Sequence, residues 1–424
     1  MYQSMDELLL IPMIVSLFAD PNTQTTGSAD LSDEMKTFYS DYLVDLTEPE
    51  LVHDQFGQKR PIPQGGGKTI EFRKYDSLAK ATTPITEGVT PNGNKLKVSA
   101  VSATVDQYGD YVTLSDVLLL TAVDNNLTEA AKLLSSQAGR TLDTVTREIL
   151  SGGTNVQYGS GQVSARYQLV GGDGTAANNH YLTVLAVRKA AASLKRQNAK
   201  KINGYYAGVA HPDVTFDLMD DENWKYPHQY VDTQNIYSGE IGEIAGVRFV
   251  ETTEAKIFHA PDLTAGSRAL TVKTTLGAPG MTVAVDEAVT AADAAALAGR
   301  KIVLNGTQYT IASATAAAAG SASITLTESV PVADGTDGKL LYPGEAGAAG
   351  RDVYSTLILG ENAYGVTDVT GGGLEMIIKP LGSGEDPLNQ RATAGWKAIK
   401  TAVRLVEQYM VRVETASTFA SGAN

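Results

Sequence analysis

Residues 69–75 read TIEFRKY and residues 96–101 read LKVSAV, and the polar stretch between them carries Pro84, Gly88, Pro91 and Gly93. The first segment alternates apolar and polar residues, and the second does so less cleanly, which predicts two β-strands joined by a long bend. A two-stranded hairpin is at best marginally stable by itself in water. We therefore expect another copy of the same protein to cover the apolar face of this hairpin.

Charge reverses sign where the hairpin begins. Residues 1–56 contain eleven acidic residues against Lys36 alone, whereas residues 57–98 contain eight basic residues against three acidic ones. Complementary fields of this kind set register and association rate between subunits. The predicted inter-subunit contacts are Lys59, Arg60, Lys68, Phe72, Arg73, Lys74 and Lys80 in the extended loop, and Asp41, Asp45, Glu48 and Glu50 in the N-terminal arm. The alternative interpretation is an acidic disordered tail beside a solvated loop.

Length and composition bound the class of protein. A chain of 424 residues with 43% hydrophobic and 19% charged residues predicts two to three globular units. The absence of cysteine excludes disulfides and thiolate chemistry and fits synthesis in a reducing cytoplasm. A net charge of −14 argues against general nucleic-acid binding. The apolar run at 8–18 is short, is broken by Pro12 and follows acidic residues, so we expect a docking arm rather than a signal or membrane segment.

A long helix is predicted after the hairpin. Apolar residues step by three and four from Leu127 to Ile149, and Gly152 and Gly153 end the pattern, which predicts a helix over residues 126–151. Asp143 and Arg147 stand at the i, i+4 spacing that supports an exposed helix face.

The remainder of the chain predicts an α+β fold with a separate module. Helices are expected at 181–197 and 214–219, and strands at 205–210, 244–252, 353–359, 374–378 and 408–414. Residues 262–349 are rich in Ala, Thr and Gly, and Asn305-Gly306 between two apolar runs is a strong hairpin signal. We interpret this region as a small β-barrel or sandwich inserted in the preceding unit.

Motifs for chemistry are incomplete. Gly65-Gly66-Gly67-Lys68 resembles a phosphate-binding loop, but the first glycine of that motif is replaced by Ile62. The acidic cluster from Asp217 to Glu222 lacks calcium-loop spacing, and the five histidines form no zinc-binding pair. We therefore predict no catalytic residues, no metal site and no cofactor.

Several runs resemble the major capsid proteins of tailed bacteriophages, in the branch typified by coliphage N-four. The resemblance is carried by residues 51–63 (LVHDQFGQKRPIP), 67–73 (GKTIEFR), 107–116 (QYGDYVTLSD), 139–143 (GRTLD), 247–252 (VRFVET) and 386–391 (DPLNQR). It covers most of the chain outside residues 1–30 and 262–349.

The resemblance implies the Hong Kong 97 type of capsid fold. The first implied parts are an N-terminal arm at 1–56, an extended loop at 57–112 and a peripheral domain at 113–179 with a spine helix at 126–151. An axial domain follows at 180–261 and 350–395, and the inserted β-rich domain at 262–349 interrupts it. Residues 396–424 return to the peripheral domain. Hexamers and pentamers of such a protein close into an icosahedral shell around double-stranded DNA.

The implied location is the virion, after assembly in the bacterial cytoplasm, without membrane contact. The implied partners are further copies of the chain, portal and scaffolding proteins, and a decoration protein on the inserted module. Two other structural functions remain open from the residues, namely an encapsulin-like non-viral shell protein and a tail or baseplate adhesin, and an enzyme is the third alternative.

Overall fold

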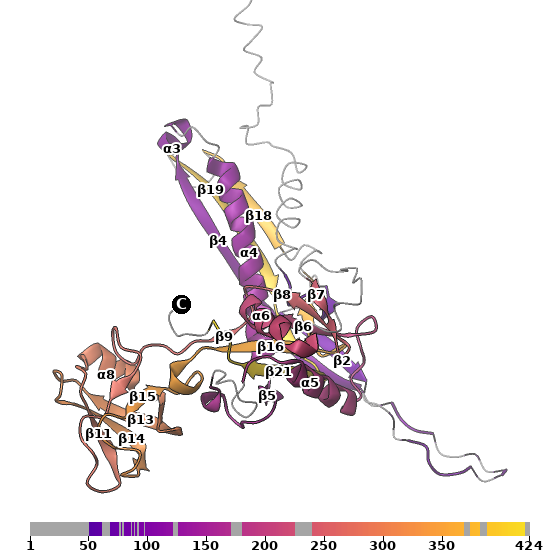
Figure 1. The fold of residues 1–424 in the computed structure, drawn as a ribbon. Helices are drawn as coiled ribbons and strands as arrows, with labels where there is room; N and C mark the ends of the chain where they lie inside the picture. The colour runs from indigo at the N-terminus through magenta and orange to yellow at the C-terminus, as the bar shows by residue number, and fades with distance from the viewer. Residues whose placement is uncertain are drawn as a thin grey trace, which may run out of the picture. The chain divides into compact units, whose positions relative to one another are not determined.

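The computed structural model describes residues 51–61, 68–75, 78, 80–85, 87–88, 90, 93–96, 98–121, 126–170, 180–224, 240–368, 374–381 and 388–419. The described residues fall into two compact units of mixed α and β structure (Figure 1). The first contains residues 106–141 and 368–400, and the second contains residues 51–105, 142–367 and 401–419. None of the described helices is long and apolar enough to cross a membrane.

The first unit is an antiparallel three-stranded sheet with a helix packed on it. The strand order is β18 (Leu374–Lys379), β19 (Arg391–Lys400) and β4 (Asp106–Ser115), and helix α3 (Asp116–Thr121) follows β4 directly. Helix α4 (Asn126–Ser151) begins in this unit and has the predicted bounds. Gln137 of α4 accepts a hydrogen bond from Trp396 Nε1 at 3.2 Å and donates one to Asp110 Oδ2 at 2.6 Å, so it ties the helix to two strands.

The second unit is built on a mixed sheet. Its main path runs β5 (Val156–Tyr158), β21 (Met410–Thr415), β16 (Val353–Leu359), β6 (Tyr206–Ala210), β8 (Val247–Glu251) and β7 (Glu240–Ile244), and β9 (Ile257–Phe258) pairs with β16. Every residue of β16 is buried, as expected of a central strand that reads as a nearly continuous apolar run. The strand predicted at 244–252 forms as β8 but begins three residues later, at Val247, because Ala245 and Gly246 both have positive φ and turn the chain between β7 and β8.

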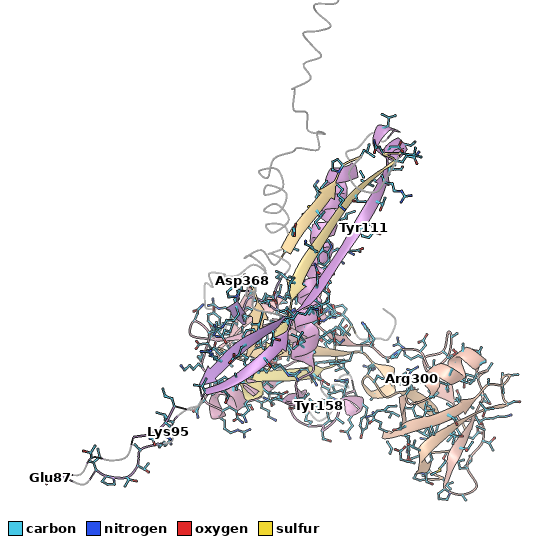
Figure 2. The ribbon with its side chains drawn as sticks, turned by 180° about the vertical axis from the view of Figure 1, so that it is seen from behind. Glu87, Lys95, Tyr111, Tyr158, Arg300 and Asp368 are labelled. Carbon is cyan, nitrogen blue, oxygen red and sulfur yellow. The ribbon has the colours of Figure 1, made fainter. Side chains whose placement is uncertain are left out.

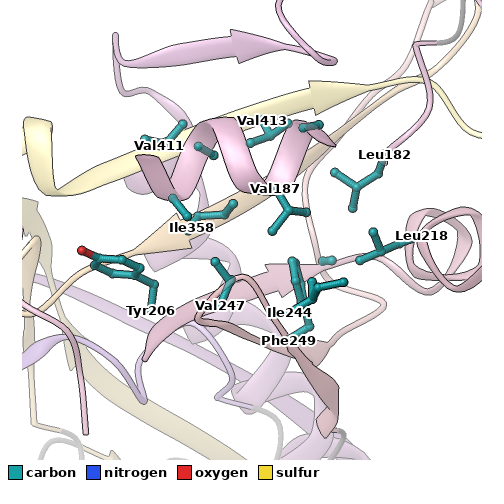
Figure 3. Packing of buried hydrophobic residues seen from close by; sticks show 14 of the residues in the cluster. Leu182, Val187, Tyr206, Leu218, Ile244, Val247, Phe249, Ile358, Val411 and Val413 are labelled. Atoms are coloured by element: carbon teal, nitrogen blue, oxygen red, sulfur yellow. The ribbon is translucent and has the colours of Figure 1, made fainter. Parts of the chain in front are cut away.

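Two helices complete the core of this sheet. Helix α5 (Val184–Arg196) is capped by Thr183, and helix α6 (Pro212–Asp220) is capped by the side chain of His211. Figure 3 shows Val187 of α5 facing the buried side chains that the strands contribute to this cluster. Short 3-10 helices lie at η2 (Arg166–Gln168), η3 (Ala348–Gly350) and η4 (Glu407–Tyr409).

The β-rich region within 262–349 has a core of its own. Its strand order is β10 (Leu270–Thr271), β15 (Leu340–Pro343), β12 (Lys301–Leu304), β13 (Thr307–Thr315), β14 (Ala322–Val330) and β11 (Gly280–Val285), with helix α8 (Ala291–Leu297). A bridge between Val272 and Val285 links the chain after β10 to β11, so the sheet closes on itself and the barrel alternative is the one that forms. The predicted turn at Asn305-Gly306 is confirmed, with φ of 51° and 81°.

Candidate assembly surface at the hairpin

The predicted hairpin forms, and its first strand has the predicted bounds. β2 (Thr69–Tyr75) pairs antiparallel with β3 (Val98–Thr104), from Thr69 opposite Thr104 to Tyr75 opposite Val98. The second strand therefore begins two residues later than the sequence predicts. A single residue, Val105, separates β3 from β4, and these two strands have different partners, β2 and β19.

The apolar face of the two strands is covered by the same chain. Ile70, Phe72 and Ala103 are buried, with Val403 and Leu405 packed against them. These covering residues lie some 300 positions downstream in the sequence, where no local pattern links them to the hairpin. The expectation that another copy covers the strands is therefore wrong, and Phe72, which is 0% exposed, has no surface to offer to a second subunit.

Phe72 packs onto a glycine of a neighbouring small sheet. This sheet has the order β1 (Gln58–Arg60), β17 (Tyr364–Thr367) and β20 (Ala402–Arg404), and β1 runs parallel to β17 along one edge. A Cβ atom on Gly365 would lie 2.4 Å from Cε1 of Phe72. The ring thus occupies space that exists only because position 365 has no side chain.

The segment leading into β1 is anchored under helix α4. His53 contacts Asp143 through its backbone N–H at 2.8 Å and through Nδ1 at 2.6 Å, and Thr146 donates to Asp54 at 2.7 Å. Asp143 is buried, so its predicted exposed pairing with Arg147 is wrong. Arg147 instead donates to the backbone carbonyl of Glu254 at 2.8 Å.

The arm residues proposed to face this region, Asp41, Asp45, Glu48 and Glu50, lie outside the described residues, as does the side chain of Lys74. Lys59, Lys68 and Lys80 are exposed, as an inter-subunit contact requires of a free subunit. Lys74 and these three lysines remain predicted contacts.

Beyond the ends of β2 and β3, the described parts of residues 78–96 lack strand pairing. Leu78, Ile85 and Leu96 are 55%, 75% and 73% exposed. Figure 2 shows Glu87 and Lys95 along this stretch, which extends beyond the paired strands. The hairpin therefore has a buried base and an exposed, partly apolar end.

Two of the predicted contact residues, Arg60 and Arg73, line one hollow of about 550 Å³ at the base of the hairpin. Lys200, from the loop after α5, is the third cation there, and Glu361 is the one carboxylate among the lining residues. Arg73 approaches Glu71 at 3.7 Å, but both side chains are more than half exposed, so this ion pair stabilises the fold little. Sequence reasoning missed Lys200, whose only local signal is the basic pair Lys200-Lys201 after a helix.

Among the described residues, no three His, Asp or Glu side chains are grouped so that they could hold a metal ion. Within the acidic cluster of the sequence, Asp217 serves the fold. Its carboxylate accepts hydrogen bonds from the hydroxyl and backbone N–H of Thr418, at 2.6 and 3.1 Å. Burial raises the pKa of Asp217. This carboxylate anchors the chain that follows β21.

Residues 98–283 match the family described as phage capsid protein, and the match covers less than half of the chain. It supports the descriptions capsid protein, bacteriophage, virion and structural protein, and it favours a non-enzymatic role. No curated protein matches this chain in sequence.

Solved capsid structures are similar to the chain at low identity. The capsid of Ralstonia phage GP4 has a TM-score of 0.48 and 13% identity, covering 95% of this chain and 97% of that chain. The capsid of cyanophage P-SCSP1u has a TM-score of 0.47 and 13% identity, covering 86% of this chain and 87% of that chain. A virus-like particle from Pyrococcus furiosus has a TM-score of 0.41 and 8% identity, covering 90% of this chain and 99% of that chain. All three TM-scores are below 0.5, so these similarities carry no argument about function.

Proposed function

We propose that this protein is the major capsid protein of a tailed bacteriophage of the coliphage N-four-like branch, with the Hong Kong 97 type of fold. Copies associate through the β2–β3 hairpin into hexamers and pentamers of a shell that encloses double-stranded DNA. The family match over residues 98–283 supports the capsid role, and the runs quoted from the sequence support the branch. Portal, scaffolding and decoration proteins are the further partners of this proposal.

The observation that carries the proposal is the contrast between the two ends of the hairpin. Its base is fixed by the buried ring of Phe72, whereas Leu78, Ile85 and Leu96 are exposed near basic side chains such as Lys80 and Lys95. Burial of exposed apolar groups against a partner lowers the free energy of the system. Because the base of the hairpin is fixed by packing, these groups are held where a partner can cover them. The basic side chains orient such a partner and select an acidic surface.

The test is electron microscopy of the purified protein, with sedimentation to determine particle mass. We expect icosahedral shells or capsomer rings, in the presence of scaffolding protein if the chain alone stays soluble. A small oligomer under all these conditions would contradict the capsid proposal. Shells that copurify with enzyme cargo instead of DNA would point to a non-viral compartment, and fibre-like trimers that bind glycans would point to an adhesin.

A shortened hairpin tests the contact itself. Tyr75 and Val98 lie opposite each other, so residues 76–97 can be replaced by Asn-Gly, the dipeptide preferred in two-residue hairpin turns. We expect this variant to keep the melting temperature of the parent and to form no shells. The matched control replaces the module at 262–349 by a short linker, and it should assemble. Shells of normal size from the shortened hairpin would contradict the role of its end.

A further inference from the structure

The hollow at the base of the hairpin concentrates positive charge that the described part of the chain leaves uncompensated. Arg60 comes from β1, Arg73 from β2 and Lys200 from the loop after α5, so three separate segments contribute one cation each. Neither Arg60 nor Lys200 forms an ion pair with a carboxylate of the described residues. Glu361, the one acidic lining residue, accepts a long hydrogen bond from Asn362 at 3.5 Å.

The hollow also has an apolar wall. Leu405, Val406 and Tyr409 line it, and each is only partly buried. Arginine binds carboxylates through two parallel N–H bonds and keeps its charge at any physiological pH, so two arginines and a lysine in one hollow favour an anionic occupant. The apolar wall favours an occupant that carries aliphatic or aromatic side chains next to its carboxylates.

We propose that this hollow receives the acidic segment at residues 41–50 of a second copy of the chain. The inference rests on the proposed function, because it names the segment through which one capsid subunit engages the next. Residues 41–50 read DYLVDLTEPE, with four carboxylates, no basic residue and four large apolar or aromatic side chains. The segment thus matches both the charge and the apolar wall of the hollow.

We assign the segment to a second copy because a contact between copies would join subunits into a ring. Each chain carries one acidic segment and one basic hollow, so every subunit both gives and receives. A head-to-tail contact of this kind generates a closed ring when its rotation closes. A contact within one chain would add nothing to association between subunits.

The test uses two full-length variants with reversed charge. The first carries Arg60→Glu and Lys200→Glu, and the second carries Asp45→Lys and Glu48→Lys. We expect both to fold with the parent's melting temperature and to lose shell formation when each is alone. A 1:1 mixture should recover assemblies that contain both variants, seen as six-membered rings by electron microscopy, because alternating subunits bring each reversed hollow against a reversed segment on its neighbour.

The matched control carries Lys195→Glu and Arg196→Glu. Both residues are exposed at the end of α5, lie shortly before Lys200 and do not line the hollow, so this variant should assemble like the parent. A second readout does not depend on shells: carbodiimide cross-linking of mixed light and ¹⁵N-labelled chains should join Lys200 to Glu48 in mixed-isotope pairs. Cross-links confined to same-isotope pairs would place the segment in its own copy and overturn the proposal.

Other outcomes separate this proposal from the proposed function. If the parent forms shells and both reversed variants also assemble alone, the hollow proposal fails while the capsid function stands. If the hollow variant assembles normally but loses affinity for duplex DNA in fluorescence anisotropy, the occupant is a phosphate backbone and the proposal is overturned. If the control loses assembly as fully as the hollow variant, the effect is one of general charge and the hollow has no specific occupant.

Discussion

Asp143 of helix α4 accepts the backbone N–H of His53 at 2.8 Å and lies 2.6 Å from Nδ1 of the same residue, with both side chains no more than 1% exposed. His53 follows the acidic N-terminal residues by a few positions, and β1 begins five residues after it. This contact therefore fixes the chain between the end of the acidic segment and the start of β1. It also determines how β1 reaches the hollow that Arg60 lines.

Replacement of Asp143 by Ala should destabilise the protein by about 2–5 kcal/mol, because it leaves two buried donors of His53 without an acceptor. The measurement is the free energy of unfolding from chemical denaturation. Glu129→Ala is the control on the same helix, since the exposed ion pair of Glu129 with Lys132 contributes at most about 0.5 kcal/mol. Equal effects from the two variants would show that the buried contact does not stabilise the helix.

Phe72 and Gly365 should behave as a coupled pair. Phe72→Ala should cost about 3–5 kcal/mol because it empties a fully buried site. Gly365→Ala should cost about 1–3 kcal/mol because its new methyl group clashes with the ring.

The double variant Phe72→Ala with Gly365→Ala should cost less than the sum of the two single changes, because the smaller side chain leaves room for the methyl group. Val98→Ala, at a half-exposed position of β3, should stay within about 0.5 kcal/mol of the parent. Strict additivity of the two changes would show that the contact between positions 72 and 365 is absent in solution.

The free energy of unfolding should fall in mild acid because protonation of His211 removes the cap of helix α6. Its Nδ1 accepts the N–H of Asp213 at 3.2 Å as the cap of α6, which requires an unprotonated nitrogen. Burial lowers the pKa of His211, while Asp213 and Glu251 oppose that shift and His259 reinforces it. The unfolded chain therefore takes up this proton first, and the cap's contribution is lost as pH falls below about 6.5 toward the lower folded-state pKa.

The measurement is the free energy of unfolding between pH 8 and pH 5 for the parent and for His211→Asn, which keeps a capping oxygen but does not titrate. The variant should lose less stability with acid, by up to about 1.4 kcal/mol per pH unit below the unfolded pKa. Identical pH profiles would refute the role of His211.

The barrel should fold as an isolated fragment of residues 260–350. Its core is its own, and Arg300 donates to the carbonyls of Asp262 and Pro261, both at 2.9 Å, at the start of the region (Figure 2). We expect a cooperative thermal transition by circular dichroism. A fragment that shows no transition would mean that the remainder of the chain supports the barrel.

The turn of β12 and β13 provides a graded probe of the same fragment. Gly306→Ala should cost about 1–2 kcal/mol, because position 306 has φ of +81°. Gly277→Ala, where an added Cβ meets nothing within 4 Å, should change stability by less than about 0.5 kcal/mol. A reversed order of these effects would contradict the turn geometry.

Patterns of neighbouring residues in the sequence were enough to predict several helices, strands and turns. Helix α4, strand β2 and the Asn305-Gly306 turn follow from apolar spacing and from residues that accept positive φ, so neighbours in sequence suffice to specify them. The sign reversal of charge around residue 56 is likewise a property of the chain itself. These features defined the hairpin as a candidate contact before any packing was known.

Tertiary packing decided which surfaces remain free. Asp143 has the i, i+4 spacing of an exposed ion pair with Arg147, yet it is buried in contact with His53, ninety positions away in the sequence. Phe72 loses its surface to residues near 365 and 403, and Arg60 and Arg73 gain Lys200 as a neighbour. The physical reason is that burial and electrostatic pairing depend on distance in space. A hydrophobic pattern indicates that a side chain will be buried, but it does not indicate which distant segment packs against it.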